Sequence, residues 1–235
     1  MALLGVLSAG PLAGQERGGW PGRTAYANPS AAVAAELDLA RAMAERGRWP
    51  ALAATAAPAA VLFVPQPVWA RTWLKGRTDA GRVTPNRQPV RLWASCDGSL
   101  VASEGLWNSA GQGGWFLTLW QRQDDGAFKW ILAEDGLATA QDAAPPDMVS
   151  AVVADCPERR RPAAGAEAGR HRAQPKKEKV RDLPPLDPAG HSGASADGSL
   201  RWSVTVAADR SRRLVIAWTK DGTAATVLDR TLPGN

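Results

Sequence analysis

Residues 89–107, PVRLWASCDGSLVASEGLW, decide the fold that we expect for this chain. Apolar and polar residues alternate on both sides of Asp97-Gly98, and an Asp-Gly pair is typical of the two-residue turn of a β-hairpin, where both positions need a positive φ. A turn at this place predicts that Arg91 lies opposite Glu104. The two strands predicted are Pro89–Cys96 and Leu100–Trp107.

The alternation continues after this hairpin, in Trp115–Gln123 and Phe128–Glu134. Asp124-Asp125-Gly126 is expected to join these two segments as a three-residue loop with Gly126 in the left-handed conformation. That loop would place Trp120 opposite Trp130.

Before the strands, the spacing of apolar residues is helical. Asn28-Pro29 is typical of a helix start, and Arg46-Gly47 is typical of a helix end. The stripe expected to face the core is Val33, Leu37, Ala40 and Ala44. Further elements are predicted at 51–57 (helix), 61–64 (strand) and 71–75 (a helical turn).

The C-terminal part of the chain is expected to be a second β unit. A further strand is predicted at 148–154, and the segment 157–195, which is rich in Pro, Ala, Lys and Arg, is interpreted as a linker. Alternation in Leu200–Val206 and Leu214–Trp218 predicts a three-stranded meander that is too small to be stable alone and must dock. The predicted division is an extended, signal-like segment (1–27), an α+β domain (28–156), the linker (157–195) and the meander (196–235).

The net charge of +5 belongs to the linker. Residues 157–182 contain nine basic and four acidic residues, a balance of +5, so the rest of the chain is neutral. A basic run is either an electrostatic footprint for nucleic acid or a solvated linker. Since no aromatic residue is interleaved for base stacking, we expect no specific nucleic-acid partner.

The N-terminal residues suggest export. Residues 1–14 are small and apolar, like the centre of a secretory signal, but no basic residue precedes them, so either the signal is weak or the true start lies upstream. In a periplasmic or secreted protein, Cys96 and Cys156 would form a disulfide; the alternative is two unpaired thiols. No apolar stretch is long enough for a transmembrane segment.

Several short segments carry a resemblance to a known family. They are the helix around Ala35-Glu36-Leu37, the strand exit Phe63-Val64-Pro65, the turn Ser95–Leu100, and Trp120–Gln123 with Trp130 after its turn. With these segments, residues 28–136 resemble the SnoaL-like branch of the nuclear-transport-factor-2-like superfamily. The resemblance implies a cone-shaped α+β domain, N-terminal helices on a curved antiparallel sheet, an apolar pocket between them and a homodimer through the open sheet face.

The sequence offers few catalytic groups. Both histidines, His171 and His191, fall in the predicted linker, and no phosphate-binding glycine motif is present, so we expect no metal and no cofactor. Catalytic members of the superfamily use a carboxylate base, for which Glu104 and Glu134 are the candidates. The alternative for Glu104 is a cross-strand ion pair with Arg91, and for Glu134 a paired or solvent-facing position.

Eleven tryptophans are unusual beside three Phe and one Tyr. They indicate either a hydrophobic ligand pocket or a core and dimer face. The candidate pocket residues are Trp69, Trp73, Trp93, Trp120 and Trp130.

Two functions follow as hypotheses. The first is a non-catalytic module of the cell envelope that binds a small apolar ligand or serves as a scaffold. The alternative is a SnoaL-like isomerase, hydrolase or lyase that acts on a small apolar carbonyl compound through a pocket carboxylate.

Overall fold

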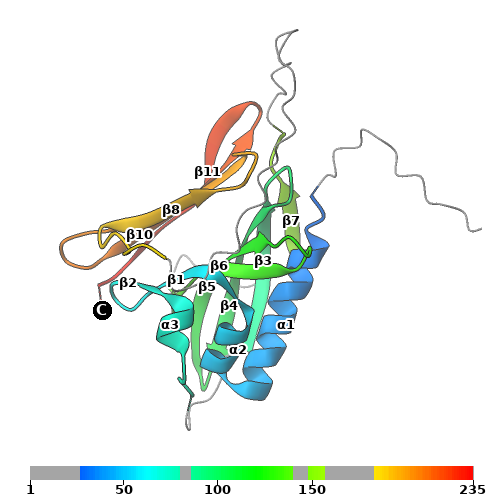
Figure 1. Ribbon diagram of the computed structural model, residues 1–235. Helices are drawn as coiled ribbons and strands as arrows, with labels where there is room; N and C mark the ends of the chain where they lie inside the picture. Colours follow the sequence, from blue (N-terminus) through cyan, green and yellow to red (C-terminus); the bar gives the residue numbers. More distant parts are fainter. Residues whose placement is uncertain (1–26, 80–85, 140–147, 157–182, 235) are drawn as a thin grey trace, which may run out of the picture.

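The computed structural model describes residues 27–79, 86–139, 148–156 and 183–234. These residues form an α+β protein with three layers (Figure 1). Helices cover one face of a seven-stranded mixed sheet, sheet A, and a four-stranded antiparallel sheet, sheet B, packs against the other face. The α+β class is confirmed. In the part of the chain described, no helix is long and apolar enough to cross a membrane.

The helices are α1 (Ser30–Arg46), α2 (Arg48–Thr55) and α3 (Ala70–Leu74). The strands of sheet A are β1 (Ala56–Phe63), β2 (Pro67–Trp69), β3 (Asn86–Ala94), β4 (Leu100–Ser109), β5 (Gln112–Arg122), β6 (Phe128–Leu137) and β7 (Ser150–Val153). The strands of sheet B are β8 (Gly190–Ala194), β9 (Leu200–Val206), β10 (Arg212–Lys220) and β11 (Thr223–Leu232).

Sheet A has the strand order β2-β1-β6-β5-β4-β3-β7. Its centre, β3 to β6, is the expected antiparallel meander, and the predicted registers Arg91–Glu104 and Trp120–Trp130 are both confirmed. The expectation of a wholly antiparallel sheet is wrong at two places, because β1 pairs with β6 and β3 pairs with β7 in parallel. Each of these two pairs joins strands that are far apart in the sequence, which no hairpin pattern predicts.

The long helix α1 begins two residues after Asn28, whose side-chain oxygen accepts a hydrogen bond from Ser30 N–H. Its buried face is not the stripe expected. Leu37 is 46% exposed, whereas the buried face contains Glu36, with Ala32, Leu39, Ala42 and Met43. A carboxylate occupies a core position of this helix because two side chains of sheet A bind it, as described below.

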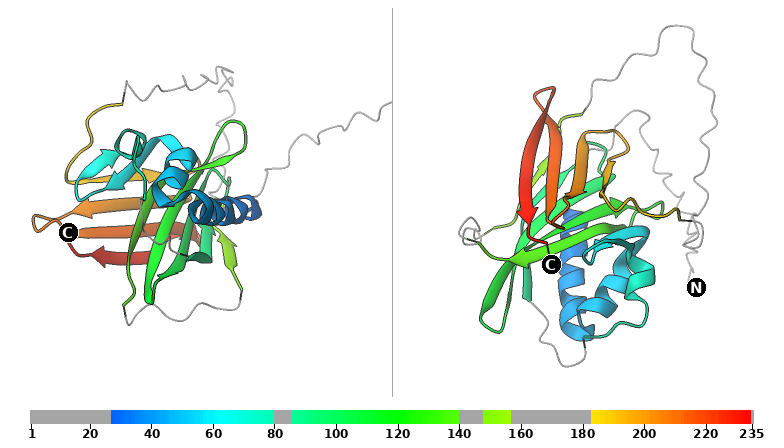
Figure 2. Two further views of the ribbon diagram at one scale, coloured as in Figure 1. Left: turned by 90° about the horizontal axis from the view of Figure 1, so that it is seen from below. Right: turned by 90° about the vertical axis from the view of Figure 1, so that its left-hand side faces the viewer.

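Sheet B has four strands, not the three expected. The added strand, β8, lies within the predicted linker, so the linker boundary at residue 195 is wrong, and His191 lies in a strand. The basic run at 157–182 and the signal-like residues 1–14 lie outside the described residues. Figure 2 shows sheet B facing sheet A on the side away from the helices. Sheet B therefore occupies the sheet face through which we expected a homodimer.

The two faces of sheet A have separate cores. Helix-side residues of sheet A, such as Trp120 and Trp130, pack with α1 and α2. Residues of the opposite face, such as Trp93 and Leu117, pack with sheet B through the apolar side chains of Leu200, Trp202, Val204, Leu214, Ile216, Leu228 and Leu232. The predicted docking of the C-terminal sheet is thus observed, and it supplies the second cover that a sheet with two apolar faces needs.

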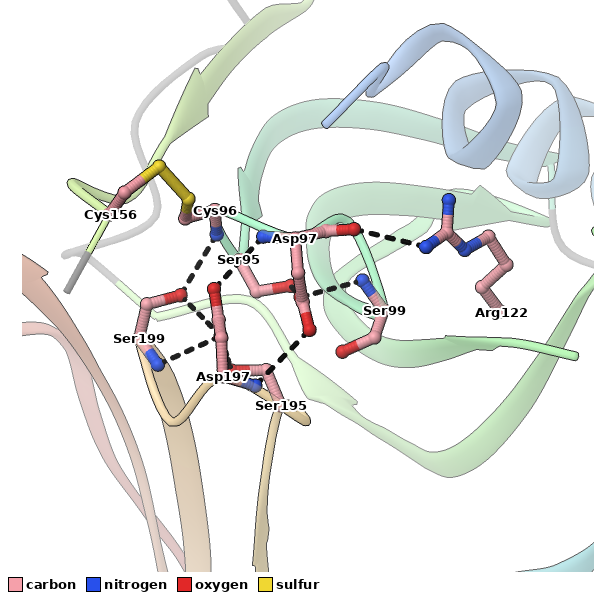
Figure 3. The surroundings of a disulfide bond; sticks show 9 residues. All are labelled: Ser95, Cys96, Asp97, Ser99, Arg122, Cys156, Ser195, Asp197 and Ser199. Carbon is pink, nitrogen blue, oxygen red and sulfur yellow. Dashed lines mark hydrogen bonds between the residues drawn. A yellow bond between two sulfur atoms is a disulfide. The ribbon is translucent and has the colours of Figure 1, made fainter. Parts of the chain in front are cut away.

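Two turns with nearly the same sequence lie where the sheets meet (Figure 3). Ala94–Leu100 reads ASCDGSL and Ala194–Leu200 reads ASADGSL. In the first turn, Asp97 Oδ1 accepts hydrogen bonds from Ser95 Oγ (2.7 Å) and Ser99 N–H (2.9 Å). Asp197 makes the equivalent bonds in the second turn, at 2.6 and 3.0 Å. Each turn is therefore closed by its own side-chain hydrogen bonds.

The two turns also bind each other reciprocally. Asp97 N–H donates to Asp197 Oδ2 (2.9 Å), and Asp197 N–H donates to Asp97 Oδ2 (3.1 Å). In the same way, Cys96 N–H donates to Ser199 Oγ (2.8 Å), and Ala196 N–H donates to Ser99 Oγ (2.9 Å). We call these two segments, 95–99 and 195–199, the paired turns. Burial alone would raise the pKa of Asp197, but hydrogen bonds from Ser195 and Ser199, together with the one from Asp97 N–H, outweigh it and hold the pKa below its usual value.

The expected disulfide is confirmed at the edge of the paired turns. Cys96 and Cys156 are bonded, with their Cα atoms 5.0 Å apart (Figure 3). The residue before Cys156, Asp155, also reaches sheet B, since its carboxylate accepts a hydrogen bond from Lys220 Nζ (3.2 Å). The disulfide therefore fixes the end of β7 beside the contact between the sheets.

We predict that Asp97→Ala and Asp197→Ala each lower the free energy of unfolding by about 1–3 kcal/mol, because each change leaves N–H groups of the paired turns without an acceptor. The double variant should lose less than the sum of the two single variants by at least about 0.5 kcal/mol. Urea unfolding of the four proteins measures this coupling.

The matched control is Asp209→Ala, because Asp209 Oδ1 accepts hydrogen bonds from the N–H and the hydroxyl of Ser211 in a similar turn that is exposed to solvent. Its effect should be smaller and should add to that of Asp97→Ala. Strict additivity of Asp97→Ala and Asp197→Ala would contradict the reciprocal contact.

Candidate functional site

Glu104, the first candidate base, lies on the face of sheet A that sheet B covers. It is opposite Arg91 in register, but it does not form the expected ion pair with it. Arg230 of β11 donates a hydrogen bond to Glu104 Oε1 at 3.2 Å, and the Arg91 guanidinium lies 5.6 Å from the ring centre of Trp93. Glu104 points into the space between the sheets, where it meets Arg230 of β11. The register of the β3–β4 hairpin contains no information about this contact with the second sheet.

Glu134, the second candidate, is also between the sheets and is deeply buried. Its side chain is 4% exposed and pairs with Arg212 of β10 at 3.4 Å. Burial raises its pKa from 4.5 to about 7, and the nearby charge of Arg212 opposes this only in part. Glu134 therefore titrates near neutral pH inside an ion pair.

The five candidate tryptophans do not gather around one cavity. Trp120 and Trp130 are in the helix-side core, Trp93 is in the core between the sheets, and Trp69 and Trp73 lie at the β2–α3 corner. There, Trp73 packs edge-on against Trp49, while Trp69 lies beside His191. Since these side chains belong to three separate places, the structure assigns most of them to the core.

A buried polar cluster lies between α1 and sheet A. Glu36 has an exposed fraction of 0%, and it accepts hydrogen bonds from Arg87 (2.8 Å) and from Trp120 Nε1 (2.8 Å). Arg87 also donates to Thr118 Oγ1 (2.9 Å) and lies 3.7 Å above the ring centre of Phe116. The buried carboxylate is thus paired and hydrogen-bonded, as burial of a charge requires.

This cluster borders a cavity of about 170 Å³, which we call the helix-side cavity. Its lining residues are Met43, Arg48, Arg87, Trp107 and Asp135. Arg48 forms an ion pair with Asp135, so both arginines of the lining have an acidic partner. Each arginine charge of the lining is therefore matched by a carboxylate, although Arg87 Nε makes no hydrogen bond within the described residues. The remaining walls are the side chains of Met43 and Trp107.

Trp107 reaches the cavity because a glycine lies opposite it in the sheet. Its ring covers Gly114, where an added Cβ would come within 2.2 Å of the indole. Trp115 lies over Gly136 in the same way. A side chain at either glycine would push the ring away, so these glycines set the position of the two indoles.

The sequence reasoning missed the residues that line the cavity. Arg87 lies before the predicted strand start at Pro89, and Glu36 is one position away from the predicted apolar stripe. The paired turns did have a signal, since the repeat ASxDGSL recurs at a separation of 100 residues. Among the described residues, no group of three His, Cys, Asp or Glu side chains could hold a metal ion.

No protein-family model matches the chain, and no curated protein matches it.

We predict that Glu134 makes stability fall as the pH rises. In the unfolded chain the carboxyl ionises near its ordinary pKa of 4.5, whereas in the folded protein it keeps its proton until about pH 7. The folded state therefore binds more protons within this window, and its stability should decrease there by up to about 3 kcal/mol. Urea unfolding at about pH 5 and about pH 8 measures the change.

Glu134→Gln, which cannot ionise, should remove this part of the pH dependence. Asp38→Asn, which removes an exposed acid from α1, is the control and should leave it in place. If the difference between wild type and Glu134→Gln is the same at both pH values, the elevated pKa is wrong.

Proposed function

We propose that this chain is a non-catalytic binding module of the cell envelope that holds a small apolar ligand in the helix-side cavity. The observation that carries the proposal is the composition of this cavity. Its two arginines are neutralised by Glu36 and Asp135, which leaves Met43 and the Trp107 indole as the ligand-facing walls. A balanced, apolar cavity favours an uncharged, apolar ligand.

The position of the two candidate bases supports binding over catalysis. Glu104 and Glu134 lie on the opposite face of sheet A from the cavity, and each is bound by an arginine of sheet B. A reaction at the helix-side cavity would therefore have neither carboxylate within reach. For this reason we favour the binding module over the isomerase, hydrolase or lyase.

The layer order supports a SnoaL-like arrangement as part of this proposal. The helices α1 and α2 lie on one face of a meander, and the cavity opens between helix and sheet, as in the cone of that superfamily. The Cys96–Cys156 disulfide supports a location in an oxidising compartment, the periplasm or the cell exterior.

Methionine methyl groups provide a direct test. The chain has three methionines, of which Met43 lines the cavity and Met148 is 81% exposed. We predict that toluene, used as a small apolar probe, shifts the ¹³C-methyl signal of Met43 in a saturable way and leaves the Met148 signal in place. Met43→Leu identifies the reporting signal by removing it.

Cyclohexylammonium, a cation of similar size, should not shift the Met43 signal, because a balanced apolar cavity does not stabilise an unpaired charge. A Met43 signal that does not respond to toluene, or that shifts linearly together with Met148, would contradict the proposed function.

A further inference from the structure

A second and larger cavity lies between the two sheets, at the ends of β6 and β11. Its volume is about 700 Å³, and we call it the inter-sheet cleft. Its walls include Arg212 and Arg230 of sheet B and the tryptophans Trp107 and Trp115 of sheet A. Two carboxylates, Asp135 and Asp229, also line it, and each is paired with an arginine outside the lining, Arg48 and Arg213. It is separate from the helix-side cavity, although Trp107 and Asp135 border both.

Arg212 is a buried cation whose charge is incompletely compensated. Its side chain is 5% exposed, and its Nε and Nη1 atoms make no hydrogen bond within the described chain. The contact with Glu134 is a single one at 3.4 Å, longer than an ordinary charged hydrogen bond, and Oε1 of Glu134 likewise has no donor there. Buried N–H groups without an acceptor are costly, and an anion in the cleft would reduce that cost.

Arg230 places a second guanidinium at the cleft, next to an aromatic wall. It donates to Glu104 Oε1 at 3.2 Å, which holds the side chain across the gap between the sheets. Its guanidinium carbon lies 4.2 Å from the ring centre of Trp115. Two cations and two indoles therefore border the same space, and Arg230, 20% exposed, is the more accessible of the two cations.

We propose that the inter-sheet cleft binds a small organic anion, a carboxylate attached to a flat apolar body. The carboxylate would lie beside Arg230 within the field of Arg212, and the apolar body would lie against Trp107 and Trp115. An inorganic anion would interact with the two arginines but would make no contact with the indoles. An anion that also has an apolar body interacts with both, so we expect an organic anion to bind more tightly. This site shares Trp107 and Asp135 with the helix-side cavity, but its two arginines do not line that cavity, and Met43 does not line the cleft.

Isothermal titration calorimetry of the full chain tests the site with benzoate, benzyl alcohol and inorganic phosphate. We expect benzoate to bind at least about tenfold more tightly than benzyl alcohol, which has the same ring without the charge, because a charge-assisted hydrogen bond is lost. Benzoate should also bind more tightly than phosphate, which lacks the apolar body. Arg230→Gln should weaken benzoate binding by at least about fivefold.

The matched control is Arg201→Gln, since Arg201 is exposed on β9 and does not border the cleft. It removes the same charge from the same sheet and should change benzoate affinity by less than about twofold.

Glu134→Gln provides a test in the opposite direction, because it removes the anion that competes for Arg212. The other charged groups that act on Glu134 are its neighbour Asp135 and Arg48 of α2, and both remain in the variant. At about pH 8, where Glu134 is ionised, the variant should bind benzoate several-fold more tightly than wild type. At about pH 5.5, where Glu134 is protonated and benzoate is still ionised, the two proteins should bind it about equally.

A gain of affinity cannot result from a damaged fold, so this variant separates a binding role from a structural one. The proposal is overturned if benzoate does not bind, if it binds no more tightly than benzyl alcohol or phosphate, or if Arg230→Gln and Arg201→Gln have equal effects. Since the helix-side cavity is tested separately through Met43, failure here leaves the proposed function unaffected.

Discussion

Both faces of sheet A are apolar, and the need to cover both of them determines the architecture. On one face, α1 and α2 bury Trp120 and Trp130. On the other face, sheet B buries Trp93 and Leu117. Neither cover has enough apolar surface on its second side to form a core of its own, so the stability of each depends on sheet A. The long sequence separation between sheets A and B does not make them independent domains.

Buried carboxylates mark each of the two contacts between layers, and every one of them has an arginine from the opposite layer or strand. Glu36 of α1 is bound by Arg87 of β3, and Glu134 of β6 is paired with Arg212 of β10. Such pairs contribute little net stability, because desolvation of the two charges offsets their attraction. They do penalise wrong packing strongly, since a shifted layer would leave a charge buried alone. We therefore interpret these pairs as determinants of how the layers align.

The hairpins could be predicted from the sequence because their information is local. Asp97-Gly98 determines the β3–β4 register, and Gly126 determines the contact between Trp120 and Trp130. The parallel pairing of β3 with β7 depends on contacts between distant segments. The burial of Glu36 does so too, because its carboxylate is stabilised there by hydrogen bonds from Arg87 and Trp120. Alternation and helical spacing describe one segment at a time and contain no such information. The repeat in the paired turns was present in the sequence, but its meaning depends on the two copies facing each other.

The paired turns have the pattern of an isologous contact, in which each partner offers the other the same groups that it receives. In most proteins such a contact joins two identical subunits, whereas here both copies of the motif belong to one chain. In a contact of this kind, exchanging the two partners gives the same set of hydrogen bonds, and all of these bonds form in only one relative orientation of the partners. The chain therefore contains, in the four hydrogen bonds between the paired turns, the geometric rule of a symmetric dimer. The orientation of sheet B relative to sheet A is therefore determined by the turn 195–199 and not by the length of the chain that joins the two sheets.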